Sequence, residues 1–354
     1  MSRTPLNAFC ALTMGQSPDS ESYNIEHNGF PFYQGNADFG RIHPMVRVWC
    51  SAPKKLAKAG DILISVRAPI GALNIADCDC CIGRGLAAIT PDATCADTMF
   101  LFYALYASAA ELQRRGTGST FKAISKNALS NLLLPSYCLE EQKEISAVLQ
   151  QVDHLISLRQ RQAEKLDELV KARFVEMFGD PVLNTRRLPS VSGTSLFKLS
   201  NGKAVPAEKR FDSGIPAYGG NGISWYTDEA LINTDTLVVG RVGFQSGNVH
   251  FVYGPLWITD NAMYVTWYRK ELICLRFLNQ LMKRVDFSRY QDAGDLKKIT
   301  QKPFMKFEYI LPSMNLQMEF VNFMDSVNCE KERIQRSAAL LETLKRSLMQ
   351  QYFG

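Results

Sequence analysis

The sequence lacks the long apolar runs of a membrane protein and the biased composition of a disordered or fibrous one. Its longest apolar run, at 99–110, is far shorter than the ~20 residues that a membrane span needs. Apolar residues make up 46% of 354 positions, enough to give each of two domains a core. The start shows no basic segment followed by an apolar stretch, so we expect no secretory signal. We therefore expect a soluble cytoplasmic protein whose nine scattered cysteines are reduced and form no disulfides.

Motifs of the common enzyme classes are also missing. We find no GxGxxG, no GxxxxGK[ST] phosphate loop, no HExxH, no GxSxG and no NPPY-type or DPPY-type methyltransferase motif. Four histidines and one cluster of cysteines are too few candidate residues for a catalytic triad or a zinc site. These residues are His27, His43, His154, His250, Cys78, Cys80 and Cys81. We expect no catalytic residue and no metal site.

The net charge of +5 is small but unevenly distributed. Residues 1–139 carry +2 and residues 181–314 carry +6, whereas residues 140–180 carry −3 and residues 315–354 are neutral. The positive charge therefore lies on the two long blocks, as a polyanion-binding surface would require. An ordinary solvated surface accounts for the charge equally well.

The chain repeats one unit of about 175 residues. GFPFYQGN (29–36) aligns without gaps with GIPAYGGN (214–221), and five of the eight positions are identical. Three further matches follow in the same order in both halves. They are DILISVR (61–67) with DTLVVGR (235–241), LPS (134–136) with LPS (311–313), and LDELVKARFVEMFG (166–179) with LETLKRSLMQQYFG (341–354). The nearly constant offset indicates a duplication with loop insertions.

Each half changes in character at the LPS signal. Before it, short β-branched and aromatic stretches are separated by Gly, Pro, Asn and Asp, which indicates strands and turns. After it, Gly and Pro are almost absent and apolar residues recur every three or four positions, which predicts a helix with a coiled-coil seam. The seam positions are Ile145, Leu149, Val152, Ile156, Ala163, Leu166 and Val170, then Phe320, Met324, Val327, Ile334, Ala338, Leu341, Leu344 and Leu348. Arg159 and Lys331 interrupt the two seams at different levels.

A helix over about 140–178 would be ~58 Å long, far more than is needed to cover one face of a domain. A single apolar stripe usually packs on its own core, but two equal stripes at equivalent places favour pairing of the helices. We therefore predict an α+β protein with two mixed, mostly β domains, at 1–138 and 181–314, each followed by a helix, at 139–180 and 315–354. The helices are expected to form an antiparallel coiled coil with pseudo-two-fold symmetry.

These motifs resemble the specificity subunits of type I restriction–modification systems. The resemblance covers essentially the whole chain, and the repeated order of the motifs is more specific than any one of them. In the first half it is carried by TMGQSP (13–18), GDILISVRAPIG (60–71), IGRGLAAI (82–89), GTGSTFKAIS (116–125) and LPSYCLEEQKEI (134–145). In the second half it is carried by GIPAYGGN (214–221), LVVGRVGFQSGNV (237–249), ITDNA (258–262) and LPSMNLQMEF (311–320), which lacks the acidic LEEQKEI head.

The resemblance implies a DNA reader without chemistry of its own. Each β-rich domain would be a target recognition domain for one part of an interrupted site in double-stranded DNA. The paired helices would set the spacer and carry two methyltransferase subunits. S-adenosylmethionine, ATP and Mg²⁺ would then serve the methyltransferase and the restriction/translocase subunits in a prokaryotic cytoplasm, and this chain would hold no cofactor.

Side chains suited to reading DNA lie in loops at corresponding places in the two halves. Amides can pair with adenine, Arg and Lys can pair with guanine, and lysines can neutralise phosphates. The candidates are Gln34, Asn36, Arg67, Arg84, Lys122 and Lys126, then Asn221, Arg241, Gln245, Asn248, Lys297, Lys298 and Lys302. Arg67 and Arg241 are expected at matched strand ends. For any single candidate, a solvated or turn-fixing side chain stays an alternative, and Phe30, Phe32 and Trp225 are expected in the core.

We therefore expect a specificity subunit that recognises an asymmetric, interrupted DNA site and positions adenine methyltransferase subunits on it. Two other classes stay open: a coiled-coil scaffold with two protein-binding β-rich domains, and a self-contained nucleic-acid-processing enzyme. The missing motifs and the lack of an evident acidic metal cluster argue against the enzyme. The positive charge of the two long blocks disfavours the scaffold.

Overall fold

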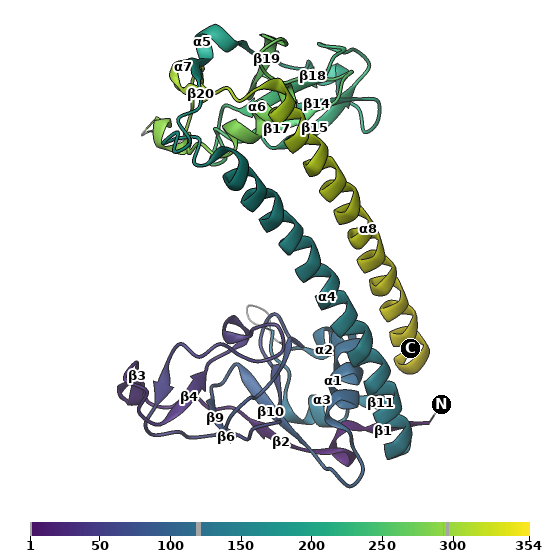
Figure 1. The fold of residues 1–354 in the computed structure, drawn as a ribbon. Helices are drawn as coiled ribbons and strands as arrows, with labels where there is room; N and C mark the ends of the chain where they lie inside the picture. The colour runs from purple at the N-terminus through teal and green to yellow at the C-terminus, as the bar shows by residue number, and fades with distance from the viewer. Residues whose placement is uncertain (1, 118–121, 293, 295–296) are drawn as a thin grey trace. The chain divides into compact units, whose positions relative to one another are not determined.

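The chain forms two compact units in the computed structural model (Figure 1). The structure describes residues 2–117, 122–292, 294 and 297–354. Unit 1 consists of Met1–Gln160 with Gln335–Gly354, and unit 2 of Arg161–Ile334. Two long helices, α4 (Leu139–Phe178) and α8 (Met314–Phe353), are each divided between the two units. Part of the predicted 116–125 motif, at 118–121, lies outside the described residues.

The main sheet of unit 1 has four antiparallel strands in the order β2-β10-β7-β8. Ile62 and Ile64 of β7 belong to the same core cluster as Phe100 of α1, whereas Leu63 between them belongs to a second cluster with Leu86. Successive strand residues point to opposite faces, so burial of both faces explains the unbroken apolar run. The bounds are β2 Cys10–Met14, β7 Ile62–Ser65, β8 Leu73–Ile75, β10 Leu86–Pro91 and α1 Thr98–Ala107.

A smaller sheet of unit 1 has the order β3-β5-β4-β9-β6, in which β4 and β9 run parallel with Tyr33 opposite Ile82. Strand β1 pairs with β11 and so brings the start of the chain to the LPS segment. Phe32 is buried and Phe30 half-buried, as expected for core aromatics. The bounds are β1 Arg3–Pro5, β3 Tyr23–Asn24, β4 Phe30–Tyr33, β5 Trp49–Cys50, β6 Leu56–Ala57, β9 Cys80–Ile82, β11 Leu133–Pro135, α2 Ala109–Arg115 and α3 Lys126–Ser130.

Unit 2 repeats this topology. Its main sheet has the order β13-β19-β16-β17, and Leu237 and Val239 of β16 belong to one core cluster while Val238 belongs to another. Strands β14 and β18 run parallel with Tyr218 opposite Ile258, like β4 and β9 in unit 1. The bounds are β12 Ser190–Ser192, β13 Phe197–Asn201, β14 Ile215–Gly219, β15 Gly222–Thr227, β16 Thr236–Gly240, β17 Val249–Val252, β18 Trp257–Ile258, β19 Ala262–Tyr268, β20 Glu308–Ile310, α5 Gly193–Leu196, α6 Leu275–Met282 and α7 Lys302–Lys306. The predicted fold class, with two β-rich domains and a long helix after each, is confirmed.

In unit 1 the first part of α4 lies against the last part of α8. The Lys345 ammonium donates to the Asp153 carboxylate at 2.6 Å, and the same carboxylate accepts the Tyr103 hydroxyl at 2.8 Å. Near the end of α8, Phe353 is buried with its ring 5.4 Å from that of Phe100. The C-terminal helix therefore completes the core of the unit that contains the N-terminus.

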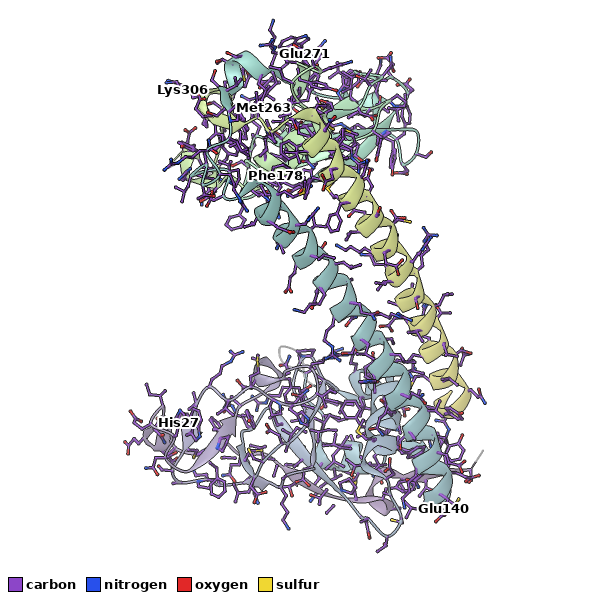
Figure 2. The ribbon with its side chains drawn as sticks, in the orientation of Figure 1. His27, Glu140, Phe178, Met263, Glu271 and Lys306 are labelled. Carbon is purple, nitrogen blue, oxygen red and sulfur yellow. The ribbon has the colours of Figure 1, made fainter. Side chains whose placement is uncertain are left out.

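In unit 2 the last part of α4 lies against the first part of α8 in the same antiparallel sense. Lys331 donates to Asp167 at 2.6 Å. Phe178 lies at the end of α4 (Figure 2). Its ring is buried in the core, 4.9 Å from that of Phe277 on α6. Each β-rich domain is thus packed by the start of its own helix and by the end of the other helix.

Most of the predicted seam positions are buried or half-buried. Ile145, Leu149, Val152, Ile156, Phe320, Met324, Val327 and Ile334 are buried, and Leu166, Leu341 and Leu348 are half-buried. Leu344 is wrongly assigned, because it is 46% exposed and the neighbouring Lys345 makes the contact with α4. Ile145 and Phe320 also pack into the domain cores, because the start of each long helix covers its own domain as well as the end of the other helix. Lys331, which interrupts the apolar seam of α8, forms an ion pair with Asp167 of α4.

Candidate nucleic-acid interface

Backbone hydrogen bonds join four loops at one end of the main sheet of unit 1. The Gly83 N–H donates to the Tyr33 carbonyl at 2.8 Å. The Val66 N–H donates to the Gly85 carbonyl and the Ile124 N–H to the Val66 carbonyl, both at 2.9 Å. These bonds connect residues 34–36, 66–71, 83–85 and 122–124, which we call the first loop face.

Most of the predicted DNA-reading residues of the first half meet on the first loop face. Gln34, Arg67, Arg84 and Lys122 are exposed there, and Asn36 is half-buried. Lys126, also exposed, follows closely as the first residue of α3. The residue types are a mixture of amides and cations, as base and phosphate contacts both require.

Close backbone contact fixes how Gln34 and Arg84 are presented. A Cβ on Gly85 would lie 2.5 Å from the Gln34 carbonyl oxygen, so only glycine fits there. The Gln34 amide donates to the Ser17 hydroxyl at 3.0 Å, and that hydroxyl also accepts the Arg84 N–H at 3.3 Å. Gln34 is therefore held in one orientation, while the Arg84 side chain stays exposed.

Unit 2 builds the same frame from equivalent bonds. The Thr259 N–H donates to the Tyr218 carbonyl at 2.9 Å, as Gly83 does to Tyr33. The Arg241 N–H donates to the Asn261 carbonyl at 2.9 Å, and the Ile299 N–H donates to the Arg241 carbonyl at 3.0 Å. These bonds connect residues 219–221, 241–248, 259–261 and 297–299, which we call the second loop face.

The prediction that Arg67 and Arg241 occupy matched positions is wrong by one residue. Arg241 makes the backbone bonds that Val66 makes, and the residue equivalent to Arg67 is Val242. The sequence alignment placed both arginines at a strand end without the sheet register that decides the match. Arg241 is half-buried, and its guanidinium donates to the Asp260 carbonyl at 3.3 Å, so it braces the second loop face.

At matched positions the two loop faces carry different side chains. Gln34 corresponds to Gly219, Arg67 to Val242 and Arg84 to Asp260, whereas Lys122 corresponds to Lys297. Lys122 and Lys297 occupy matched positions because each precedes the residue whose carbonyl closes the loop. The Thr117 N–H donates to the Ala123 carbonyl, and the Asp292 N–H donates to the Lys298 carbonyl. The frame, one cation and the amide pair Asn36 and Asn221 are therefore common, while the side chains opposite Gln34, Arg67 and Arg84 differ.

The other candidates of the second half also lie on or beside the second loop face. Asn221, Gln245, Asn248, Lys297 and Lys298 are exposed, and Lys302 is exposed at the start of α7. Sequence reasoning missed Phe244, whose side chain is 86% exposed between these polar residues. An aromatic residue inside a β-rich stretch carries no sequence signal that would predict such exposure.

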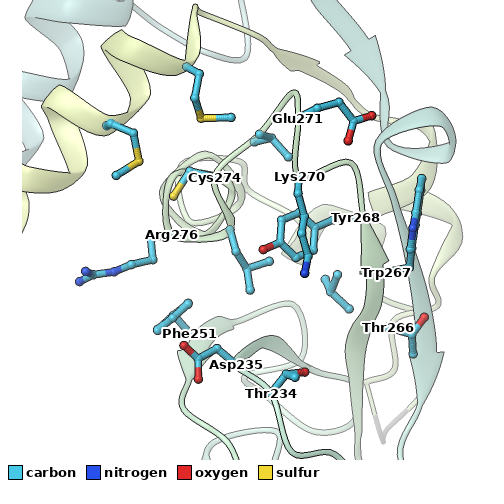
Figure 3. Close-up of a pocket in the computed structure, with 15 residues that line it drawn as sticks. Thr234, Asp235, Phe251, Thr266, Trp267, Tyr268, Lys270, Glu271, Cys274 and Arg276 are labelled. Atoms are coloured by element: carbon cyan, nitrogen blue, oxygen red, sulfur yellow. The ribbon is translucent and has the colours of Figure 1, made fainter.

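A pocket of about 1060 Å³ opens at the other end of the same sheet of unit 2 (Figure 3). Asp235, Lys270, Glu271 and Arg276 give it charges of both signs, and Arg276 is already paired with Asp325. Strand β16 separates it from the second loop face, since Asp235 precedes that strand and Arg241 follows it. The mixed charge and position set this pocket apart from the residues predicted to bind DNA.

The thiols have the properties of structural residues. Burial raises the pKa of Cys10 and of Cys81 to about 12, and it also raises the pKa of Cys78 and Cys80. Thiols so hard to ionise are poor nucleophiles and poor metal ligands at neutral pH. Among the described residues, no group of three or more His, Cys, Asp and Glu side chains could hold a metal ion.

No helix in the described part of the chain has the length and hydropathy of a membrane span.

The fold and the two loop faces define a protein with two similar but non-identical β-rich domains on one chain. A family model for the type I restriction modification DNA specificity domain matches residues 6–168. The match covers the first β-rich domain and most of the helix after it, and the chain is similar to curated specificity subunits of type I restriction enzymes.

Three comparisons illustrate the relationship. The MjaX type I restriction enzyme specificity subunit of Methanocaldococcus jannaschii is 43% identical over 163 residues, which are 46% of this chain and 38% of that protein. The EcoprrI specificity subunit of Escherichia coli is 24% identical over 348 residues, which are 91% of this chain and 86% of that protein. The crystal structure of the S subunit of a type I system from M. genitalium shares the fold with a TM-score of 0.65 at 16% identity, covering 100% of this chain and 96% of that one.

Proposed function

We propose that this chain is the DNA sequence-specificity subunit of a type I restriction–modification complex. It binds an asymmetric duplex site in two parts and positions adenine methyltransferase subunits there, with restriction/translocase subunits completing the complex. S-adenosylmethionine, ATP and Mg²⁺ belong to those partners, and the chain itself performs no chemistry.

The observation that carries the proposal is the pair of loop faces with one frame and different side chains. Direct readout needs donors and acceptors placed against base edges, and positioning needs cations on phosphates. Lys122 and Lys297 are the same residue type at matched positions and suit a contact that carries no sequence information. Arg84 and Asp260 are opposite in charge at matched positions and suit different bases, because Arg pairs with guanine and Asp accepts from cytosine. Two different half-sites make the whole site asymmetric.

The long helices support the role of a spacer. In each unit the α4 and α8 segments are joined by charge pairs, through Asp153 and Lys345 in one and through Asp167 and Lys331 in the other. The outward-facing charged residues of α4, such as Glu140 and Glu144, leave a polar face on which partner helices can bind.

The test is selection from a random duplex library by the full chain together with its methyltransferase subunits. Enrichment of two short half-sites separated by a gap of constant length and indifferent sequence is the expected result. The purified chain alone, assayed for methyl transfer and for cleavage, should be inactive. Equal affinity for all duplexes would overturn the proposal, and so would methyl transfer by the isolated chain.

A further inference from the structure

Phe244 is an exposed aromatic side chain at the tip of a firmly held loop. Its 86% exposure is unusual for so large an apolar residue, since a phenylalanine ring normally gains by burial. The Ser246 N–H donates to the Gly243 carbonyl at 3.0 Å, so Phe244 and Gln245 form the two corners of a β-turn. The turn therefore projects the ring and the amide side by side.

The turn is anchored on both sides. The Gly243 N–H donates to the Lys297 carbonyl at 2.8 Å, and the Gln291 amide donates to the Ser246 carbonyl at 2.7 Å. Behind the turn, the Gly247 N–H donates to the Gly240 carbonyl at 2.8 Å. Because the loop is fixed in this way, the ring can be placed against a ligand without ordering the backbone first.

The neighbours of the ring are groups that suit DNA. The Lys297 ammonium lies 5.5 Å from the ring centroid, and Gln245 and Asn248 are exposed beside it. In the major groove, an amide pairs with adenine, and the thymine of an A·T pair presents its C5-methyl group in that same groove. An aromatic ring adjacent to an adenine-reading amide is placed to cover such a methyl group.

We propose that Phe244 is a specificity-determining residue that packs on the C5-methyl group of a thymine in the half-site read by unit 2. This inference rests on the proposed function. The matched loop of unit 1 is one residue shorter and carries Pro69 in place of the ring, so the contact belongs to one half-site only. Lys297 keeps its charge at the rim of the contact for a phosphate.

The experiment uses the full chain with its methyltransferase subunits and the duplex that library selection identifies. Each thymine of the site is replaced, one at a time, by deoxyuridine, which removes only the methyl group. At one thymine the wild-type complex should lose about fourfold in affinity, the value of one buried methyl group at ~0.8 kcal/mol. The Phe244→Ala complex should bind thymine and deoxyuridine equally at that position, and Phe244→Leu should restore part of the difference.

The matched control is Tyr253→Ala, which removes a 64% exposed aromatic ring from the other end of β17. It should leave every thymine-to-deoxyuridine ratio unchanged. If Phe244→Ala changes none of these ratios while the wild-type complex keeps its two half-sites, the inference fails and the proposed function stands. If Phe244→Ala instead weakens binding of the partner subunits, the ring is a protein contact and the inference also fails. Lack of any sequence preference in the wild-type complex overturns both.

Discussion

Gln142 and Gln317 make the same three hydrogen bonds in their respective units, each from a fully buried side chain. The amide of each donates to two backbone carbonyls and accepts one backbone N–H. The partners of Gln142 are Cys95, Tyr137 and Asp97 at 2.9–3.0 Å, and those of Gln317 are Leu272, Pro312 and Cys274 at 2.9 Å. One glutamine therefore ties the first turn of each long helix to the segment before α1 or α6.

Replacing Gln142 with Ala should lower the free energy of unfolding of unit 1 by about 2–4 kcal/mol, because two carbonyls and one N–H lose their buried partner. Urea unfolding of the full chain, followed by circular dichroism, measures the effect. Gln317→Ala should act equally on unit 2. Gln151→Ala removes an exposed amide from the same helix and should change the stability by less than about 0.5 kcal/mol. A Gln142→Ala effect no larger than that of the control would contradict the account.

These glutamines also mark how far the sequence can predict the structure. The helices follow from local apolar periodicity, so their bounds at Leu139–Phe178 and Met314–Phe353 were predictable to within a few residues. The helices repeat at an offset of 175, whereas the LPS segments repeat at 177, so an alignment anchored on LPS places Gln142 opposite Glu319. The role of a buried glutamine can be identified only from its hydrogen-bond partners, some of which lie far away in the sequence.

The loop faces show the same limit. Residue type alone indicated the candidate amides and cations, and the structure brings most of them together. The sheet register decides which of them correspond, and it pairs Arg67 with Val242 rather than with Arg241. The register depends on hydrogen bonds between segments that no sequence pattern links. The exposure of Phe244 likewise depends on the distant hydrogen bonds that hold its loop, so residue type alone did not predict it.

The two lysines of the paired helices should differ in their value to stability. Lys345→Met should cost about 1–2 kcal/mol, because it leaves the half-buried Asp153 carboxylate with only the Tyr103 hydroxyl. Lys331→Met should cost less than about 0.5 kcal/mol, because water can solvate Asp167, which is 53% exposed. Urea unfolding of both variants, with an Asp153→Asn double-mutant cycle for the first, measures the difference. Equal losses would contradict the reasoning from burial.

Lys122 and Lys297 should contribute to affinity without affecting sequence preference. Each Lys→Ala change should weaken binding to all duplexes by the same factor and reduce the slope of log affinity against log salt concentration by about 0.9. Filter-binding titrations at several salt concentrations measure this slope. Lys270→Ala removes a cation from the far end of the unit 2 sheet and should leave the slope unchanged. A full slope for Lys122→Ala would remove that residue from the phosphate contacts.

Arg84 should read a base in one half-site only. Arg84→Ala should cost about 1–3 kcal/mol on the preferred duplex and relax the preference at one position, leaving the other half-site unchanged. Asp260→Ala should change the preference in the other half-site, because Asp260 stands at the matched position of unit 2. Library selection with each variant compares the two. If Arg84→Ala weakens all duplexes equally, Arg84 contacts the DNA backbone instead.

His250 should make unit 2 less stable in mild acid. Its Nε2 is buried without a hydrogen-bond partner among the described residues, and burial, helped by the positive charge of Lys283, lowers the pKa of the ring below 6.5. Above pH 6.5 both the folded and the unfolded chain carry a neutral ring. As the pH falls below 6.5, the unfolded chain takes up a proton before the folded chain does, so the free energy of unfolding decreases until the pH reaches the lower pKa of the folded state.

Urea unfolding between pH 7.5 and 5.5 measures this dependence, and one proton limits its slope to about 1.4 kcal/mol per pH unit. His250→Gln should remove the contribution. Lys283→Met should reduce it, because without the neighbouring charge the pKa of the folded ring moves back toward 6.5. Unchanged pH dependence in the His250→Gln variant would mean that a different group takes up the proton. His250 lies only two residues after Asn248, but its ring is half-buried whereas Asn248 is exposed. The His250→Gln variant should therefore keep its DNA preference, which separates loss of stability from loss of readout.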